Sequence, residues 1–283
     1  MNVAEERIRR PAEEARERGR SGSGWYAWLA RAGLVAKGVS YAIVGVLAIK
    51  LAAGHGGKAT SRQGALHTLA GESFGTVVLA LLIVGFAAYA IWRFVEAWAA
   101  PGDDGKKWAK RAGSIGRGVI YAALAFSTAK ILAGAGSSSQ NQRAHETAST
   151  LFSWPAGTWL VGIAGAVAIG VGLWNLYRGL ARKFEDHWKT GEMSETTRRW
   201  AGRVGAVGHV ARAVVFGLIG VFVIKAAIDY NPKEAIGLDG ALQKLASAAY
   251  GPYLLGLTAA GLLAYGVYCL VDARYRDVSA NRS

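Results

Sequence analysis

The chain has 283 residues, 52% of them hydrophobic, and a mean hydropathy of +0.21. In a soluble domain of this length the apolar residues would be spread by amphipathic periodicity, but here they are gathered into long uncharged blocks. The formal net charge of +14 would point to nucleic acid as the partner of a soluble protein. The apolar blocks argue against that class, and we predict an all-α polytopic membrane protein with no nucleic-acid partner.

Residues 1–24 mix acidic residues with arginines and contain no apolar core. They do not have the pattern of a cleavable signal peptide, so we expect the apolar block that follows to stay in the membrane. A Ser-Gly-Ser-Gly run at residues 21–24 is typical of a flexible linker. We predict that residues 1–24 form a basic tail that is either disordered or a fraying helix.

A helix of about 20 mostly apolar residues is long enough to cross a bilayer core of about 30 Å. Six segments meet or approach that length, so we predict six transmembrane helices. They are residues 34–53, 74–98, 114–133, 157–177, 207–228 and 252–272.

One pattern is repeated three times along the chain. The motif W-x-x-R-x-G begins at Trp28, Trp108 and Trp200, each time shortly before an apolar segment. Each copy is followed by two predicted crossings, so all copies have the same orientation and we expect a pseudo-threefold axis along the membrane normal. The predicted parallel repeats are residues 25–101, 102–184 and 185–277, followed by a tail at 278–283.

The second helices of the repeats align as well. In the third repeat the matches to the first are Gly251 with Gly75, Tyr265 with Tyr89, and Asp272 with Glu96. The middle repeat is more divergent, and there Gly157 and Trp174 match Gly75 and Trp92.

The basic residues alternate between connections. Of the 33 Lys and Arg residues, eight lie in residues 1–37, six in 93–117, eight in 178–212 and three in 274–282. The connections at 54–73, 134–156 and 229–251 hold two, one and two. The positive-inside rule therefore predicts a cell inner membrane protein with both termini in the cytoplasm, where anionic lipid headgroups supply the counter-charge.

Two matched sets of basic residues follow from the repeats. Lys37, Arg117 and Arg212 lie near the start of each first helix, and Lys50, Lys130 and Lys225 lie 13 residues later. The later set predicts either a ring that binds anions or three lysines that snorkel to the interface. For the earlier set we expect contacts with anionic lipid headgroups. Thirteen residues turn a helix by about 140°, so both sets cannot face one axis.

Two charged pairs stand at the ends of second helices. Arg93 and Glu96 have i, i+3 spacing, and Asp272 and Arg276 have i, i+4 spacing, so each pair can form an ion pair. We interpret both as pairs at the cytoplasmic boundary, and a gate built from Arg93, Glu96 and Asp272 is the alternative.

Aromatic residues gather near the ends of the apolar segments, as expected for side chains at headgroup level. Trp25 and Trp28 are one turn apart and predict a short interfacial helix before the first crossing. The other residues of this kind are Tyr26, Trp108, Trp154, Trp159, Trp188 and Trp200.

Few residues could carry catalysis. No Asp or Glu lies near the middle of an apolar segment, and the five His residues lack metal-binding spacing. Cys269 is the single cysteine and lies inside the last segment, so no disulfide can form within the chain. The sequence predicts no catalytic residue, no metal and no cofactor.

Three motifs together resemble a bacterial membrane family catalogued as domain of unknown function 1206. They are the repeated R-x-G-x-x-[AG]-[KR]-G pattern, the segment at 237–242, and the Ala-Arg-Tyr-Arg run at 273–276. The resemblance covers residues 28–277 and implies six helices in three two-helix repeats, without an established activity or site. The third copy departs from the pattern by three inserted residues and by Ala213 in place of Gly.

These observations favour a non-enzymatic scaffold or accessory protein of the cell envelope, with the lipid bilayer and other membrane proteins as partners. The first alternative is a small channel or transporter for anionic or small solutes, with Lys50, Lys130 and Lys225 around its path. The second alternative is an intramembrane enzyme.

Overall fold

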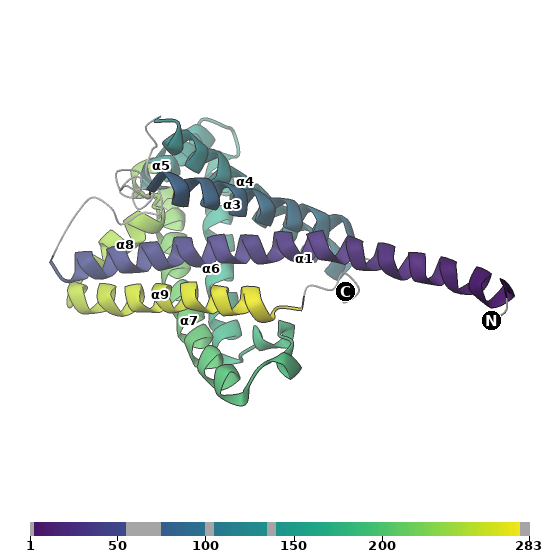
Figure 1. The fold of residues 1–283 in the computed structure, drawn as a ribbon. Coiled ribbons are helices and arrows are strands. Elements are labelled where there is room, and N and C mark those ends of the chain that lie inside the picture. The colour runs from purple at the N-terminus through teal and green to yellow at the C-terminus, as the bar shows by residue number, and fades with distance from the viewer. Residues whose placement is uncertain (1–2, 55–74, 100–104, 135–139, 278–283) are drawn as a thin grey trace.

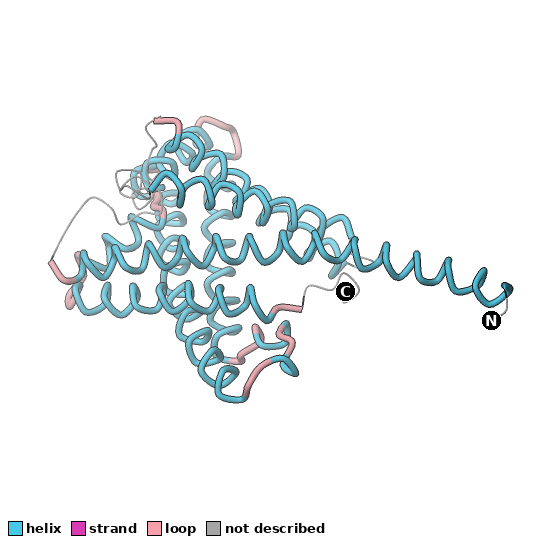
Figure 2. Tube along the Cα trace, in the orientation of Figure 1, coloured by secondary structure: helices cyan, strands magenta, loops and turns pink. Residues whose placement is uncertain are grey.

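A computed structural model describes residues 3–54, 75–99, 105–134 and 140–277. These residues are almost entirely helical, and none of them belongs to a strand (Figure 2). The six long helices are α1 (Val3–Ala52), α3 (Gly75–Ala99), α4 (Gly105–Leu132), α6 (Gly157–Leu180), α7 (Glu195–Ile228) and α9 (Gly251–Tyr275). The short elements are α5 (Gln140–Phe152), α8 (Leu238–Ala246), and the single turns η1 (Glu185–His187), η2 (Thr190–Glu192) and η3 (Pro232–Glu234).

Each of the six long helices is long and apolar enough to cross a membrane. Each predicted transmembrane segment falls on one of them, which confirms the prediction of a six-helix membrane protein. Large apolar side chains on these helices point outward, among them Leu81, Val119 and Leu257 at 66%, 56% and 75% exposure. Such an outer surface is expected where the solvent is lipid.

Helix α1 begins well before the first apolar segment. It starts at Val3 and continues without a break into the first apolar segment, so residues 3–24 are helical and extend beyond the other helices (Figure 1). Ala, Glu and Arg are among the strongest helix formers and are frequent in this stretch. Trp25 and Trp28 therefore lie within α1, both about half exposed at 51% and 58%, in place of the separate interfacial helix that we predicted.

Short helices occupy two connections that sequence reading left as loops. Helices α5 and α8 lie in the connections after α4 and α7, and they meet where the backbone N–H of Gly237 donates to the Asn141 side chain at 3.3 Å. The Tyr230 hydroxyl donates to the Phe152 carbonyl oxygen at 2.9 Å, which adds a second tie between the two connections. Together they cover the helix ends opposite the basic connections.

The long helices pack most extensively between repeats. The main pairs are α3 with α4, α6 with α7, and α1 with α9. Each pair joins the second helix of one repeat to the first helix of the next, and the third repeat closes on the first. Figure 1 shows α1 lying along α9, with α6 and α7 running at a steep angle to both. This cyclic order is what three parallel repeats around a common axis produce.

Within a repeat, the two helices pack together in the first and third copies. Helix α1 packs on α3 and α7 on α9, while α4 and α6 make little contact in the described residues. A Cβ on Gly85 would overlap that of Ala36, and one on Gly261 would overlap that of Ala211. Small residues let helices in lipid approach this closely.

The middle repeat has different residues at these places. Gly116 takes the place of Ala36, because the matching of Lys37 with Arg117 adds 80 in the first helix. Val167 takes the place of Gly85, because the matching of Gly75 with Gly157 adds 82 in the second helix. A Cβ on Gly116 would have no atom within 4 Å, and Val167 is 59% exposed. The middle hairpin is therefore open where the other two are closed.

Candidate functional site: a cationic cavity among the six long helices

A cavity of about 800 Å³ lies among the long helices, and all six contribute to its wall. The lining residues come mainly from the helix halves next to the basic connections, for example residues 89–96 of α3 and 171–178 of α6. We call this side of the molecule the basic end. Toward the opposite end the lining includes Gln140 and Leu238, the first residues of α5 and α8.

The earlier set of matched basic residues faces this cavity. Lys37, Arg117 and Arg212 all line it, one from each repeat. So do the aromatic residues four positions later, Tyr41, Tyr121 and Phe216. The cavity therefore lies where the three repeats meet.

The later set does not reach the cavity. Lys50, Lys130 and Lys225 are exposed and are absent from its lining. Lys225 instead forms ion pairs with Asp229 at 2.8 Å and Glu234 at 3.0 Å. The structure thus brings together the set for which we expected only lipid-headgroup contacts, and it does not bring the three outer lysines to a shared path.

Matched residues of the second helices complete the wall. The first repeat supplies Tyr89, Trp92 and Glu96, and the third supplies Tyr265, Tyr268 and Asp272. The middle repeat supplies Val171, Trp174 and Arg178 at the same places. Two repeats therefore offer a tyrosine and a carboxylate where the middle repeat offers a valine and a guanidinium.

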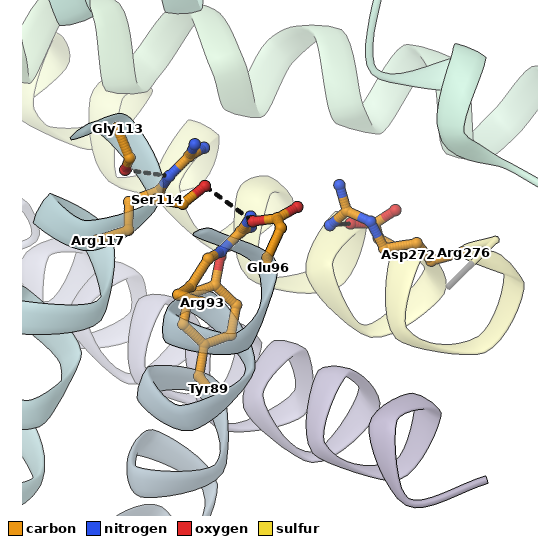
Figure 3. Close-up of polar contacts among 8 residues, drawn as sticks. All are labelled: Tyr89, Arg93, Glu96, Gly113, Ser114, Arg117, Asp272 and Arg276. Carbon is orange, nitrogen blue, oxygen red and sulfur yellow. Dashed lines mark hydrogen bonds and ion pairs between the residues drawn. The ribbon is translucent and has the colours of Figure 1, made fainter. Parts of the chain in front are cut away.

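Arg93 is held by two neighbours on its own helix (Figure 3). It forms an ion pair with Glu96 and donates to the Tyr89 hydroxyl at 2.6 Å. Ser114 of α4 donates to the same Glu96 carboxylate at 3.0 Å, which ties α4 to α3. The pair predicted from the i, i+3 spacing forms, and its charge is neutralised locally.

Asp272 and Arg276 form the second predicted pair, at 2.9 Å. Trp188 donates its indole N–H to the other oxygen of Asp272 at 3.1 Å. Trp188 is only 5% exposed, so our placement of it at headgroup level was wrong: the carboxylate gives its N–H a buried partner. Burial opposes the charge on Arg276, but Asp272 together with Tyr268 and Tyr89 raises the pKa of Arg276 overall.

His187 lines the cavity near its mouth, outside the membrane-spanning helices. Burial lowers the pKa of its imidazole, and the positive charges of Arg276 and Arg178 lower this pKa further. His187 is therefore a neutral hydrogen-bonding group at neutral pH.

Lys37 and Arg212 meet aromatic rings instead of carboxylates. The Lys37 ammonium lies 5.1 Å from the ring centre of Tyr265 and 5.9 Å from that of Tyr89. The Arg212 guanidinium lies 4.4 Å from the Tyr265 ring centre and donates to its hydroxyl at 2.6 Å. Aromatic faces stabilise cations without neutralising them, so both charges remain available to a ligand.

Arg117 and Arg178 are the least satisfied charges of the cavity. The Arg117 Nε donates to the Gly113 carbonyl of its own helix at 2.8 Å (Figure 3). Arg178 has no carboxylate within ion-pair distance in the described part of the chain, and its charge acts repulsively on Arg117. Both come from the open middle repeat.

The cavity as a whole is positive. Six basic side chains line it against three acidic ones, Glu96, Asp272 and Asp277, which leaves a formal charge of +3 with both histidines neutral. Buried Nε atoms of Arg93 and Arg212 also lack a hydrogen-bond partner. A polar anion in the cavity would offset the positive charge and accept hydrogen bonds from these Nε atoms.

Other reactive groups are held in structural roles. Among the described residues no three His, Cys, Asp or Glu side chains are grouped closely enough to hold a metal. Cys269 is buried outside the cavity lining. His209 is stacked on Phe184 at 4.8 Å, and its Nδ1 donates to the Gly205 carbonyl at 2.7 Å.

Comparison with known proteins agrees with the repeat structure. The family model described as Domain of Unknown Function (DUF1206) matches residues 32–100, 112–182 and 207–276. The chain belongs to this family. The DUF1206 chain is also 29% identical over 258 residues to the uncharacterized protein YxxB of Bacillus subtilis (strain 168), covering 90% of this chain and 93% of that protein. No solved structure matches the chain.

One local pattern in this DUF1206 sequence could have indicated which of the two basic sets lines the cavity. Lys37, Arg117 and Arg212 are each followed four residues later by an aromatic residue, which lies on the same helix face. The outer lysines are not followed in this way. Aromatic rings beside a cation are the pattern of a protein-lined site, because a snorkelling lysine needs no such neighbour.

Proposed function

We propose that this protein is a non-catalytic membrane component that binds an anionic ligand in its central cavity. The observation that carries the proposal is the group of four basic residues, Lys37, Arg117, Arg178 and Arg212, that line one cavity without a carboxylate partner in the described residues. Charges inside a membrane protein are costly unless they are paired or hydrated. An anion would stabilise this arrangement more than any neutral ligand could.

The location of the protein is part of the proposal. The basic connections favour the cytoplasmic side for the basic end and the cell inner membrane for the whole chain. The mouth of the cavity near His187 and Arg276 would then open toward the cytoplasm. The ligand would be an anion, or an anionic headgroup, that this face of the membrane presents.

An accessory role accounts for the site better than catalysis does. Ser114, the hydroxyl closest to a carboxylate in the cavity, donates to Glu96, and Glu96 is already ion-paired with Arg93. That carboxylate is a poor general base, because abstracting a proton would break its pair with Arg93. Binding, presentation or sensing of the ligand therefore fits the described residues.

The channel alternative has less support from the arrangement of side chains. The helix halves farther from the basic end carry buried packing residues such as Val44, Leu79 and Leu255, all at most 1% exposed. These residues are absent from the cavity lining, although that lining reaches Gln140 and Leu238 toward the opposite end. Flux of anions through liposomes that contain the purified protein would restore this alternative.

Ligand binding can be tested on the full chain in neutral detergent. Either inorganic phosphate or phosphatidylglycerol should raise the midpoint of thermal unfolding above that in phosphatidylcholine alone. Arg117→Gln combined with Arg178→Gln should reduce the response to the stabilising anion at least tenfold in concentration. Lys50→Gln combined with Lys130→Gln is the matched control, because it removes two charges outside the cavity.

The proposal is wrong if neither anion stabilises the protein, or if the two double variants respond alike. Arg117→Lys combined with Arg178→Lys should keep most of the response, because it preserves both charges. A loss in that variant equal to the loss in the Gln variant would also count against binding by charge.

A further inference from the structure

The open middle repeat is what distinguishes one side of the cavity from the others. Repeats one and three close their hairpins with Gly85 and Gly261, whereas the middle repeat has the exposed Val167 and leaves Gly116 without a neighbour. The wall between α4 and α6 is therefore the least tightly packed of the three hairpin walls in the described residues.

Charge is also distributed differently there. At the position of Glu96 and Asp272 the middle repeat has Arg178, which faces the cavity together with Arg117. The other hairpins thus combine a basic first helix with an acidic second helix, while the middle hairpin combines two basic ones. The negative charge missing from this repeat has to come from outside the chain.

Residues at the rim show what kind of molecule fits. Ile120 and Trp174 line the cavity and are each 58% exposed, and Val171 lines it beside them. Arg117 is six residues into the α4 span, a depth of about 9 Å, and Arg178 is two residues from the end of the α6 span. Ile120 lies deeper than Arg117 along α4, and Val171 and Trp174 lie deeper than Arg178 along α6.

This order of groups matches one ligand class. A lipid phosphate lies at the edge of the hydrocarbon core, and its acyl chains extend inward from it. We infer that the ligand is an anionic lipid whose headgroup bridges Arg117 and Arg178 and whose acyl chains lie along Ile120, Val171 and Trp174 between α4 and α6. This inference rests on the proposed function, because it names the ligand of the same cavity.

A soluble anion would satisfy the two arginines but leave the apolar gap unfilled. A second copy of the chain could cover the gap but would bring no negative charge from an apolar helix face. The lipid satisfies both requirements at once, so the charge pattern and the gap together favour it.

Native mass spectrometry of the full chain in neutral detergent can test this inference. Phosphatidylglycerol should be retained at least tenfold more than phosphatidylcholine, and inorganic phosphate at equal phosphate concentration should not displace it. Gly116→Trp and Val167→Trp, which fill the gap without touching a charge, should each lower phosphatidylglycerol retention at least tenfold. Val221→Trp is the matched control, because Val221 is 54% exposed on α7, away from the gap.

Folding is checked by an unchanged elution volume and helical circular dichroism, and Val167→Ile serves as a milder second variant with a smaller loss. Equal retention in Val167→Trp and Val221→Trp would overturn the lateral site. Displacement of the lipid by inorganic phosphate, with phosphate bound as tightly, would make the ligand a soluble anion and leave the proposed function intact. A dimer that dissociates on Val167→Trp substitution would assign the gap to a second copy.

If neither phosphatidylglycerol nor phosphate binds, the proposed function itself fails. The experiment therefore distinguishes an error about the lipid site between α4 and α6 from an error about anion binding in the cavity.

Discussion

The outer two repeats and the middle repeat share one plan and differ in how tightly they close. In repeats one and three, a glycine of the first helix lies against a tyrosine of the second: Gly33 against Tyr89, and Gly208 against Tyr265. In the middle repeat the corresponding glycine, Gly113, has only the Arg117 side chain nearby, at 3.5 Å. Three substitutions in α6 account for the difference: Val167, Val171 and Arg178.

The difference shows how three similar repeats can enclose a cavity in which one wall differs from the other two. Three identical closed hairpins would surround a cavity with equal walls. Replacing glycine, tyrosine and carboxylate in one copy opens one wall and leaves it positive. Of the four predictions that follow, the first three compare equivalent positions, so that the scaffold itself serves as their control.

Cysteine pairs should give the largest contrast. With Cys269 replaced by Ala, Ala36→Cys with Gly85→Cys should cross-link readily under a mild oxidant, because α1 and α3 are in contact there and a small shift gives the Cβ separation of about 3.5–4.5 Å that a disulfide needs. Gly116→Cys with Val167→Cys should not cross-link, because a Cβ on Gly116 has no atom within 4 Å and a disulfide needs Cα atoms within about 7 Å. Gel mobility without reductant measures both, and equal yields would mean that the middle hairpin is closed.

Removing a carboxylate should come next in size. Asp272→Asn leaves Arg276 buried without its charge partner, and we expect the free energy of unfolding to fall by about 3 kcal/mol. Arg178→Gln, at the equivalent position of the middle repeat, should cost little because Arg178 has no carboxylate to lose in the described residues. Denaturant unfolding followed by circular dichroism gives both values.

An exposed ion pair provides the control for that experiment. Asp229→Asn removes one partner of Lys225, whose side chain is 47% exposed, and should cost much less than Asp272→Asn because solvent screens the pair. A decrease in the free energy of unfolding as large as that of Asp272→Asn would show that burial of the ion pair does not determine the effect.

Alanine at the hairpin glycines should have a smaller effect. A Cβ on Gly208 would lie 2.6 Å from the Cα of Tyr265, so Gly208→Ala should destabilise by about 1–3 kcal/mol through overpacking. Gly33→Ala should destabilise the protein in the same way as Gly208→Ala. Gly113→Ala meets no such contact and should be neutral or stabilise by up to about 1 kcal/mol, because Ala has the better helix propensity. Identical thermal midpoints for all three would contradict the closed and open assignment.

The smallest expected effect is a dependence on pH. The pKa of His187 is lowered by burial and by Arg276 and Arg178, only partly opposed by Asp272 and Asp186. The unfolded state then binds the proton first, so stability is complete above pH 6.5 and falls as the pH drops below it. His187→Gln should flatten part of this slope in unfolding measured between pH 5 and 8. An unchanged slope would mean that groups other than His187 cause the pH dependence of stability.

Much of the architecture could be predicted from the sequence. The lengths of the apolar segments predict the six spanning helices, because the bilayer fixes the length of a crossing. The spacings of Arg93 with Glu96 and of Asp272 with Arg276 predict both ion pairs, because residues three or four apart share a helix face. The short helices α5 and α8 and the burial of Trp188 were missed, because local composition competes there with tertiary contacts.

What the sequence determined by itself was periodic: three repeats, six crossings, and two basic sets that cannot face the same axis. Which set faces inward was decided only by the packing of helices from different repeats, because Lys37 depends on Tyr265, more than 200 positions away in the chain. The open side of the cavity was decided in the same way. Val167 and Arg178 are unremarkable on a single helix, and they matter because the partners that close the other two hairpins are absent across the gap.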